Sequence, residues 1–182
     1  MSSSESSNPI FDQTTPEAGR RKLVVVSNRL PVSLRIEGDR VEAFPSSGGL
    51  ATAMGGLAEG DDFQWIGWPG CPIPDDRRAE AEKILAEHRL TPVTLTTEEE
   101  GHYYRGTCNQ VLWPLFHYFS GHVSFSSESW EHYVRVNERF ADTVAEHAPQ
   151  GARVWIHDFH LRLLPAALRA RRPDLQIGFF LH

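Results

Sequence analysis

The chain has 182 residues, of which 40% are hydrophobic and 23% charged, and 18 basic against 24 acidic residues give a formal net charge of −6 at pH 7. This is the composition of a soluble protein with one core of ordinary size. The mildly acidic balance argues against nucleic acid or an anionic membrane as a partner, and no apolar stretch approaches the ~20 residues that span a bilayer.

The first 21 residues are rich in Ser, Glu, Pro and Thr and hold few bulky apolar side chains. We expect them to form a flexible tail, because so little apolar surface cannot offset the entropy of ordering. The segment lacks the basic and apolar regions of a signal peptide. The two cysteines, Cys71 and Cys108, lie far apart in the sequence. A reducing cytoplasm is therefore the expected location.

Residues 22–182 read as one α/β domain. An unbroken β-branched run predicts a buried parallel strand over 23–26. Residues 32–36 and 41–44 flank Glu37-Gly38-Asp39 and predict a hairpin. A segment of small residues predicts a short helix over 50–57.

The middle of the chain continues the alternation of strands and helices. A strand is expected over 63–68, and a second over 92–95. Between them Asp75 is a plausible N-cap for a helix that runs to about residue 89. In that helix Ala79, Ile84, Leu85 and His88 fall near one face, which we expect to be buried.

The last third of the chain has the clearest pattern. Apolar residues recur at helical spacing over 129–147 and predict an amphipathic helix. A strand over 153–156, a helix over 161–171 and a strand over 175–181 then form a βαβ unit, whose two strands are parallel with a right-handed crossover.

Polar side chains follow three of the predicted strands. Ser27-Asn28-Arg29 follows the first, His157-Asp158 follows the strand over 153–156, and His182 follows the last. In an open α/β sheet, ligands bind beyond the carboxyl ends of the parallel strands, so these endings predict one shared site. Arg29 can offer a bidentate fork to a phosphate or carboxylate; a surface ion pair is the alternative.

Two glycines, Gly48 and Gly49, precede the predicted helix over 50–57. Glycines before a helix let backbone N–H groups approach a phosphate, although such pairs also serve simple turns. The sequence has no G-x-G-x-x-G and no Walker motif, so it gives no support for a dinucleotide-dependent oxidoreductase or a P-loop protein.

His157-Asp158-Phe159-His160 supports three interpretations. Asp158 can hold substrate hydroxyls, the two histidines with Asp158 can bind a metal, or a histidine can cap the following helix. Neighbours on a strand point to opposite faces, which suits chelation poorly, so we expect no metal site. The aromatic segment 103–118 is equally open, because its side chains can fill the core or line a sugar site.

Seven motifs together resemble a known family. VVVSNRLP, SSGGLA, WIGWPG, Tyr-Tyr followed by VLWPLFHY, YVRVNERFAD, WIHDFHL and IGFFLH occur in the order seen in trehalose-6-phosphate synthases. These are retaining glycosyltransferases that join glucose from a nucleotide sugar to glucose 6-phosphate. The resemblance covers about residues 23–182.

The resemblance implies a GT-B architecture, in which two Rossmann-like domains face each other across a cleft. Residues 22–182 would supply most of the acceptor-side domain, incomplete at its C-terminal end and without the nucleotide-sugar domain, so we expect the 182-residue chain alone to be inactive. The implied reaction is front-face transfer with retention that needs neither a metal nor another cofactor. The implied partners are glucose 6-phosphate and a nucleotide-glucose, with UDP-glucose as first choice. A homo-oligomer is a separate expectation for the full-length enzyme, and the sequence itself does not reveal the oligomeric state.

The resemblance also assigns roles to residues. It places Arg29 on the acceptor phosphate, Tyr104 and Trp113 along the acceptor sugar, and Asp158 on the acceptor hydroxyls. It places Gly48 and Gly49 near the donor, His182 on the transferred glucose, and Trp68 beside the cleft, with Asp158 and His182 catalytic. A non-catalytic sugar-phosphate-binding or regulatory module is the alternative function, and a metal-dependent hydrolase built on residues 157–160 is a third.

Overall fold

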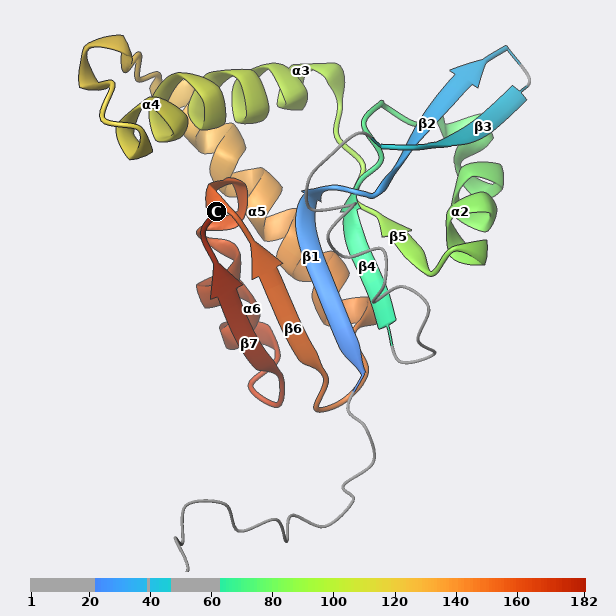
Figure 1. Cartoon of the computed structure of the whole chain (residues 1–182). Helices are drawn as coiled ribbons and strands as arrows, with labels where there is room; N and C mark the ends of the chain where they lie inside the picture. Colours follow the sequence, from blue (N-terminus) through green and yellow to red (C-terminus); the bar gives the residue numbers. More distant parts are fainter. Residues whose placement is uncertain (1–21, 39, 47–62) are drawn as a thin grey trace, which may run out of the picture.

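The computed structural model describes residues 22–38, 40–46 and 63–182 (Figure 1). Its frame is a five-stranded sheet in the order β5-β4-β1-β6-β7, and every neighbouring pair is parallel. The predicted α/β fold is confirmed. The tail predicted over 1–21, the helix predicted over 50–57, and Gly48 and Gly49 lie outside the described residues.

The strands follow the sequence closely. They are β1 (Leu23–Arg29), β4 (Phe63–Trp68), β5 (Leu90–Pro92), β6 (Arg153–His157) and β7 (Gln176–Phe180). The strand predicted over 92–95 shares only Pro92 with β5, which begins two residues earlier and ends three residues earlier. Leu90 and Thr91 pair with β4, and Pro92, which has no N–H to donate, ends the strand.

One face of the sheet is covered by α5 (Ser127–His147) and α6 (Leu164–Arg171), which lie behind it in Figure 1. Val24 and Val26 of β1 belong to the same buried cluster as Val136 and Phe140 of α5. The helix predicted over 129–147 is confirmed. It begins slightly earlier, because Ser126 caps it by accepting a hydrogen bond from a backbone N–H.

On the other face, the hairpin of β2 (Val32–Glu37) and β3 (Arg40–Pro45) and the helix α2 (Arg78–Glu87) form a second buried cluster with β1, β4 and β5, whereas Phe179 and Phe180 of β7 are exposed. Val25 of β1 points to this side, as alternation along a strand requires. The predicted hairpin is confirmed. The N-cap prediction for Asp75 was wrong, because this residue begins the short 3-10 turn η2 (Asp75–Arg77) and its carboxylate accepts a hydrogen bond from Arg78.

The buried face of α2 also differs from the prediction. Ala81 and Leu85 are buried, whereas Ala79 and His88 are exposed. Ala79 lies two residues before Ala81 and so points to nearly the opposite side of the helix, and His88 follows the last helical residue.

The sequence did not predict the helical segment over 97–116, which crosses the carboxyl-end edge of the sheet. It consists of α3 (Thr97–Glu99), a π-helical stretch η3 (Glu100–Leu112) and α4 (Trp113–Phe116), and Thr96 opens it with a capping box. Two further short turns are η4 (Ser120–His122) and η5 (Phe159–Leu161). None of the described helices combines the length and the apolarity that a membrane span needs.

Candidate functional site

The carboxyl ends of β1 and β6 and the residues after β7 meet at one cavity of about 330 Å³. This is the edge at which the strand endings predicted a shared site. The cavity is lined by side chains from these three endings, from β4 and from η3: Ser27, Asn28, Arg29, Leu30, Trp65, Tyr104, His157, Asp158, His160 and His182.

Hydrogen bonds of Ser27 and Asn28 hold the end of β1 in place, and they do not use the guanidinium of Arg29. The Ser27 hydroxyl donates to the Arg29 carbonyl oxygen at 2.6 Å and accepts from the Trp65 indole N–H at 2.7 Å. The Tyr103 hydroxyl donates to the Asn28 side-chain oxygen at 2.9 Å. The neutral polar groups around Arg29 are therefore engaged with the protein itself.

Arg29 has no carboxylate partner among the described residues. Its guanidinium carbon lies 4.5 Å from the centre of the Trp68 ring. A Cβ on Gly70, which has a φ of +91°, would clash with the guanidinium. The absence of a side chain at Gly70 thus keeps open the space that this cation occupies, and an anion is the ligand it suits.

Asp158 follows β6 in a strained backbone conformation, with a φ of +76°. Its N–H donates to the Phe180 carbonyl at 2.7 Å, and its Oδ1 accepts from the Phe159 N–H at 2.8 Å. Asp158 therefore caps η5, and the alternative that His157 or His160 does so was wrong. Its Oδ2 is 3.7 Å from His160 Nδ1, beyond hydrogen-bond distance, and remains available to a ligand in the cavity.

His160 is kept neutral by its surroundings. Its ring stacks on Tyr104 with a centroid distance of 5.7 Å. Burial lowers the pKa of His160 to about 4, although the Asp158 charge acts in the opposite direction. At neutral pH this residue therefore adds no charge to the cavity.

His157 and His182 form a pair that lines the cavity. His157 Nδ1 lies 3.0 Å from His182 Nε2, and this hydrogen bond fixes the orientation of the His182 ring. Burial, and then the neighbouring His182, lower the pKa of His157 to about 4. At neutral pH His157 is therefore uncharged. It can position His182 through this hydrogen bond without attracting an anionic ligand to itself.

The structure brings together four of the residues predicted from the sequence: Arg29, Tyr104, Asp158 and His182. Trp113 is not among the lining residues. It is 43% exposed and stacks on His117 at a centroid distance of 4.2 Å. The roles assigned to these residues, and to Gly48 and Gly49, remain predictions.

Leu30 and Trp65 line the cavity but were not predicted to do so. Trp68, expected beside the cleft, lies under Arg29 and is buried. His160 was weighed only as a metal ligand or a cap, whereas His157 was already among the strand endings that predicted the shared site. Among the described residues, metal-ligating atoms gather elsewhere, on Glu98, His102 and His132.

Comparison with known proteins gives a consistent result. The family model described as glycosyltransferase family 20 matches residues 21–182. An alpha,alpha-trehalose-phosphate synthase [UDP-forming] from Aspergillus niger is 40% identical over 171 residues, which are 90% of this chain and 36% of that enzyme. The chain thus spans about a third of the length of such relatives.

Solved structures agree with the sequence relatives. A UDP-forming synthase from Burkholderia xenovorans in complex with glucose-6-phosphate is 27% identical with a TM-score of 0.67, over 88% of this chain and 33% of that one. The N-terminal domain of a trehalose-6-phosphate phosphatase from Candida albicans is 28% identical with a TM-score of 0.72, over 94% of this chain and 36% of that one.

Proposed function

The chain belongs to glycosyltransferase family 20, and from this we propose that it forms the glucose 6-phosphate side of a trehalose-6-phosphate synthase. The whole enzyme would transfer glucose from UDP-glucose to glucose 6-phosphate with retention of configuration and release trehalose 6-phosphate and UDP. The donor assignment follows the UDP-forming activity named for the relatives.

One observation carries the proposal: a cation, an aromatic ring and a carboxylate converge on one cavity from three separate elements. Arg29 comes from the end of β1, Tyr104 from η3 and Asp158 from the residue after β6. A sugar phosphate needs these three contacts, since its phosphate is anionic, its C–H face is apolar and its hydroxyls are donors.

In this assignment Arg29 binds the phosphate and Asp158 Oδ2 accepts hydrogen bonds from acceptor hydroxyls. The resulting orientation brings the attacking hydroxyl to the face from which the diphosphate leaves, which is how the chain contributes to the rate. His182, oriented by His157, contacts a hydroxyl of the transferred glucose.

Fewer residues of this chain are assigned to binding of the donor. Gly48 and Gly49 would approach the donor diphosphate and sugar, and Trp113 would extend the acceptor side. The residues that neutralise the departing diphosphate would belong to the share of the relatives' length that the chain does not match.

Calorimetric titration of the 182-residue protein with glucose 6-phosphate, glucose and inorganic phosphate tests the acceptor assignment. We expect glucose 6-phosphate to bind more tightly than either part. A charge-assisted contact contributes about 1.5–3 kcal/mol, so Arg29→Ala should weaken glucose 6-phosphate binding by about 10- to 100-fold and leave glucose binding nearly unchanged.

Arg40→Ala is the matched control, because it removes an arginine on the hairpin that pairs with Glu42 outside the cavity. It should leave all three affinities unchanged. Equal affinities for glucose and glucose 6-phosphate, or an Arg29→Ala variant that binds like the parent, would refute the phosphate role of Arg29.

A second candidate function is a non-catalytic sugar-phosphate-binding module. It is favoured by the likeness to the N-terminal domain of the Candida albicans trehalose-6-phosphate phosphatase, a protein named for a different reaction. The complete protein that contains this chain separates the two candidates. Formation of trehalose 6-phosphate from UDP-glucose and glucose 6-phosphate would support the synthase, and binding of sugar phosphate without transfer would support the module.

A further inference from the structure

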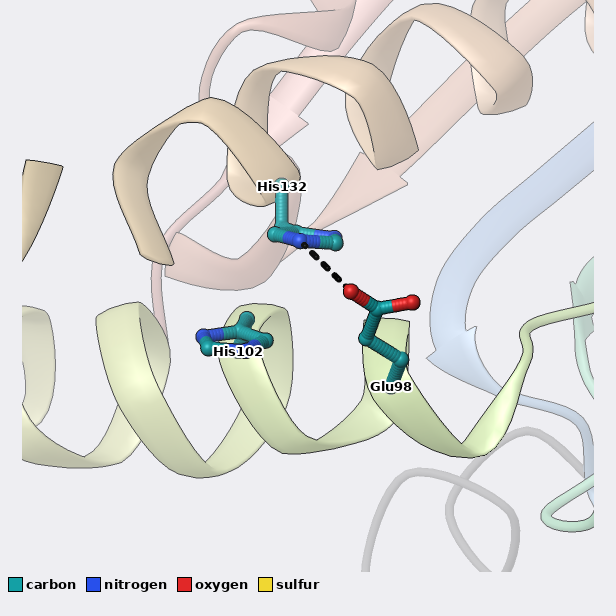
Figure 2. Close-up of side chains that lie close together, drawn as sticks. All are labelled: Glu98, His102 and His132. Carbon is teal, nitrogen blue, oxygen red and sulfur yellow. Dashed lines mark ion pairs between the residues drawn. The ribbon is translucent and has the colours of Figure 1, made fainter. Parts of the chain in front are cut away.

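A second group of polar side chains lies outside the cavity, where the helical segment over 97–116 packs on α5. It consists of Glu98 from α3, His102 from η3 and His132 from α5 (Figure 2). One potential ligand atom of each residue lies within 4.8 Å of those of the other two. None of the three residues lines the cavity described above.

His132 has polar atoms that no described residue satisfies. The residue is 6% exposed, and its Nδ1 is buried without a hydrogen-bond partner among the residues that the structure describes. Its Nε2 lies 3.9 Å from Glu98 Oε1, too far for a hydrogen bond (Figure 2). Nε2 is therefore the nitrogen of His132 that faces Glu98 and can take a ligand, whereas the unpaired Nδ1 adds to the cost of burying this imidazole.

The other two side chains are free to adjust. His102 is about a third exposed and makes one side-chain hydrogen bond, at 3.2 Å between its Nδ1 and the Ser129 hydroxyl. Its ring stacks on that of His132 with a centroid distance of 4.6 Å and an interplanar angle of 12°. Glu98 is largely exposed.

The backbone that carries this group is held firmly on both sides. The neighbouring Glu99 closes a capping box with Thr96. Its carboxylate also forms a two-pronged ion pair with Arg139 of α5, at 2.5 and 2.7 Å. Movements within the group are therefore side-chain rotations between two anchored elements.

We propose that Glu98, His102 and His132 bind one Zn²⁺ ion that joins the helical segment over 97–116 to α5. Two imidazoles and a carboxylate are a common ligand set for zinc, and the imidazoles disfavour Mg²⁺ and Ca²⁺, which prefer oxygen ligands. Zinc needs its ligands at about 2.0–2.2 Å, so the stacked ring of His102 turns and Glu98 moves inward when the ion binds.

The surroundings favour a dication. Glu128 lies beside the group, with a carboxylate oxygen 4.0 Å from His102 Nε2. Water completes the tetrahedral coordination, and Glu128 lies within reach of that water as an acceptor. The role that follows is structural, because an ion shared by two packed elements adds its binding energy to the folded state alone. This site does not depend on the proposed sugar-phosphate function.

The test is calorimetric titration of metal-free, tag-free 182-residue protein with Zn²⁺, together with thermal unfolding with and without the ion. We expect one tightly bound equivalent and a higher midpoint. His102→Asn and Glu98→Gln change partly exposed side chains, so both variants should fold. Losing a first ligand should cost at least the roughly 10- to 100-fold in affinity typical of outer-shell changes, and the rise in midpoint should shrink with it.

His88→Asn and His182→Asn are the matched controls. His88 is exposed on the far side of the sheet, and His182 lines the sugar-phosphate cavity, where it pairs with His157. Both variants should bind zinc with the parent affinity. The proposal is overturned if the parent protein binds no zinc, or if His102→Asn and Glu98→Gln bind it as tightly as the parent while His182→Asn does not.

Discussion

The sheet edge and the packed interior between α5 and η5 use polar side chains in opposite ways. Asn137 of α5 is fully buried, and all its capacity is used: it donates to the carbonyls of Tyr133 and His160 and accepts from the N–H groups of Leu163 and Leu164. At the sheet edge, the described residues leave Arg29 without an ion pair and the ring nitrogens His157 Nε2 and His160 Nδ1 without a hydrogen bond.

The difference separates groups that hold the fold from groups that await a ligand. A satisfied buried amide stabilises one arrangement of the chain, because removing it strands several partners at once. Unsatisfied buried atoms cost free energy in the empty protein, and a ligand that pairs with them recovers it. We therefore expect substitutions in the interior to change stability, and substitutions at the edge to change binding.

The largest expected effect is in the interior. Asn137→Ala removes four hydrogen bonds and leaves the N–H groups of Leu163 and Leu164, near the start of α6, without their acceptor, so the free energy of unfolding should fall by about 3–4 kcal/mol. Denaturant titration measures it. Asn109→Ala, at an exposed position of η3, is the control and should change stability by less than about 0.5 kcal/mol. A loss below about 1 kcal/mol for Asn137→Ala would contradict the contrast between the two regions.

Acid should lower the free energy of unfolding, because it protonates two buried histidines at the carboxyl-end edge of the sheet. The pKa values of His157 and His160 are both lowered to about 4, from an ordinary value near 6.5, chiefly by burial. Between these values the unfolded chain binds more protons than the folded one, so stability falls as the pH drops from 6.5 to 4. The loss at pH 4 should be on the order of 2–3 kcal/mol for each of the two histidines.

Denaturant titrations at several pH values check this, and His157→Gln should flatten part of the slope. The low pKa of Glu99, which its hydrogen bonds to Arg139 and Thr96 maintain against the opposing effect of burial, acts only below about 4.5 and does not obscure the upper part of this window. Stability that stays constant from pH 6.5 to 4.5 would mean that the two histidines are protonated in the folded protein.

Substitutions at two glycines can distinguish the effect of backbone strain on stability from the effect of the position of Arg29 on ligand binding. Gly38 and Gly70 both have positive φ, but an added Cβ meets nothing within 4 Å at Gly38 and meets the Arg29 guanidinium at Gly70. Gly38→Ala and Gly70→Ala should each cost about 1–2 kcal/mol of stability. Only Gly70→Ala should also weaken glucose 6-phosphate binding. Equal binding by the two variants would show that the position of Arg29 is not critical.

The sequence predicted the residues at the carboxyl-end edge of the sheet better than it predicted the helical segment over 97–116, which crosses that edge. β1, β4, β6 and β7 are each built on a short, mainly apolar run, and the polar endings of β1, β6 and β7 identified Arg29, Asp158 and His182. The segment over 97–116 was not predicted. Gly101, Gly106 and Pro114 interrupt its pattern, and the wider turn of η3 departs from the period of 3.6 residues on which a helix prediction rests.

Contacts between side chains that are distant in the sequence could not be predicted either. No local pattern reveals that His157 faces His182, or that His102 and His132 stack from different elements. The positive φ of Asp158 was equally hidden, since it is imposed by the hydrogen bond from its N–H to β7 and by the turn into η5. These features depend on tertiary contacts, whereas strand endings depend only on the strands that precede them.

The smallest expected change in stability is at Asp158, where structure and binding meet in one side chain. Asp158→Asn keeps an oxygen that can accept from the Phe159 N–H, and asparagine also tolerates positive φ, so unfolding should change by less than about 1 kcal/mol. The amide nevertheless removes the negative charge that Oδ2 presents to the cavity.

Hydrogen bonds to charged groups exceed neutral ones by about 1 kcal/mol, so glucose 6-phosphate should bind roughly 5- to 10-fold more weakly to Asp158→Asn. Glucose, which keeps the hydroxyls but lacks the phosphate, should lose affinity by the same factor. That shared loss distinguishes Asp158 from Arg29, whose removal affects only the phosphorylated sugar. Calorimetry and denaturant titration on the same preparation measure both effects. A collapse in stability with unchanged affinity per folded molecule would place Asp158 with Asn137 among the groups that hold the fold.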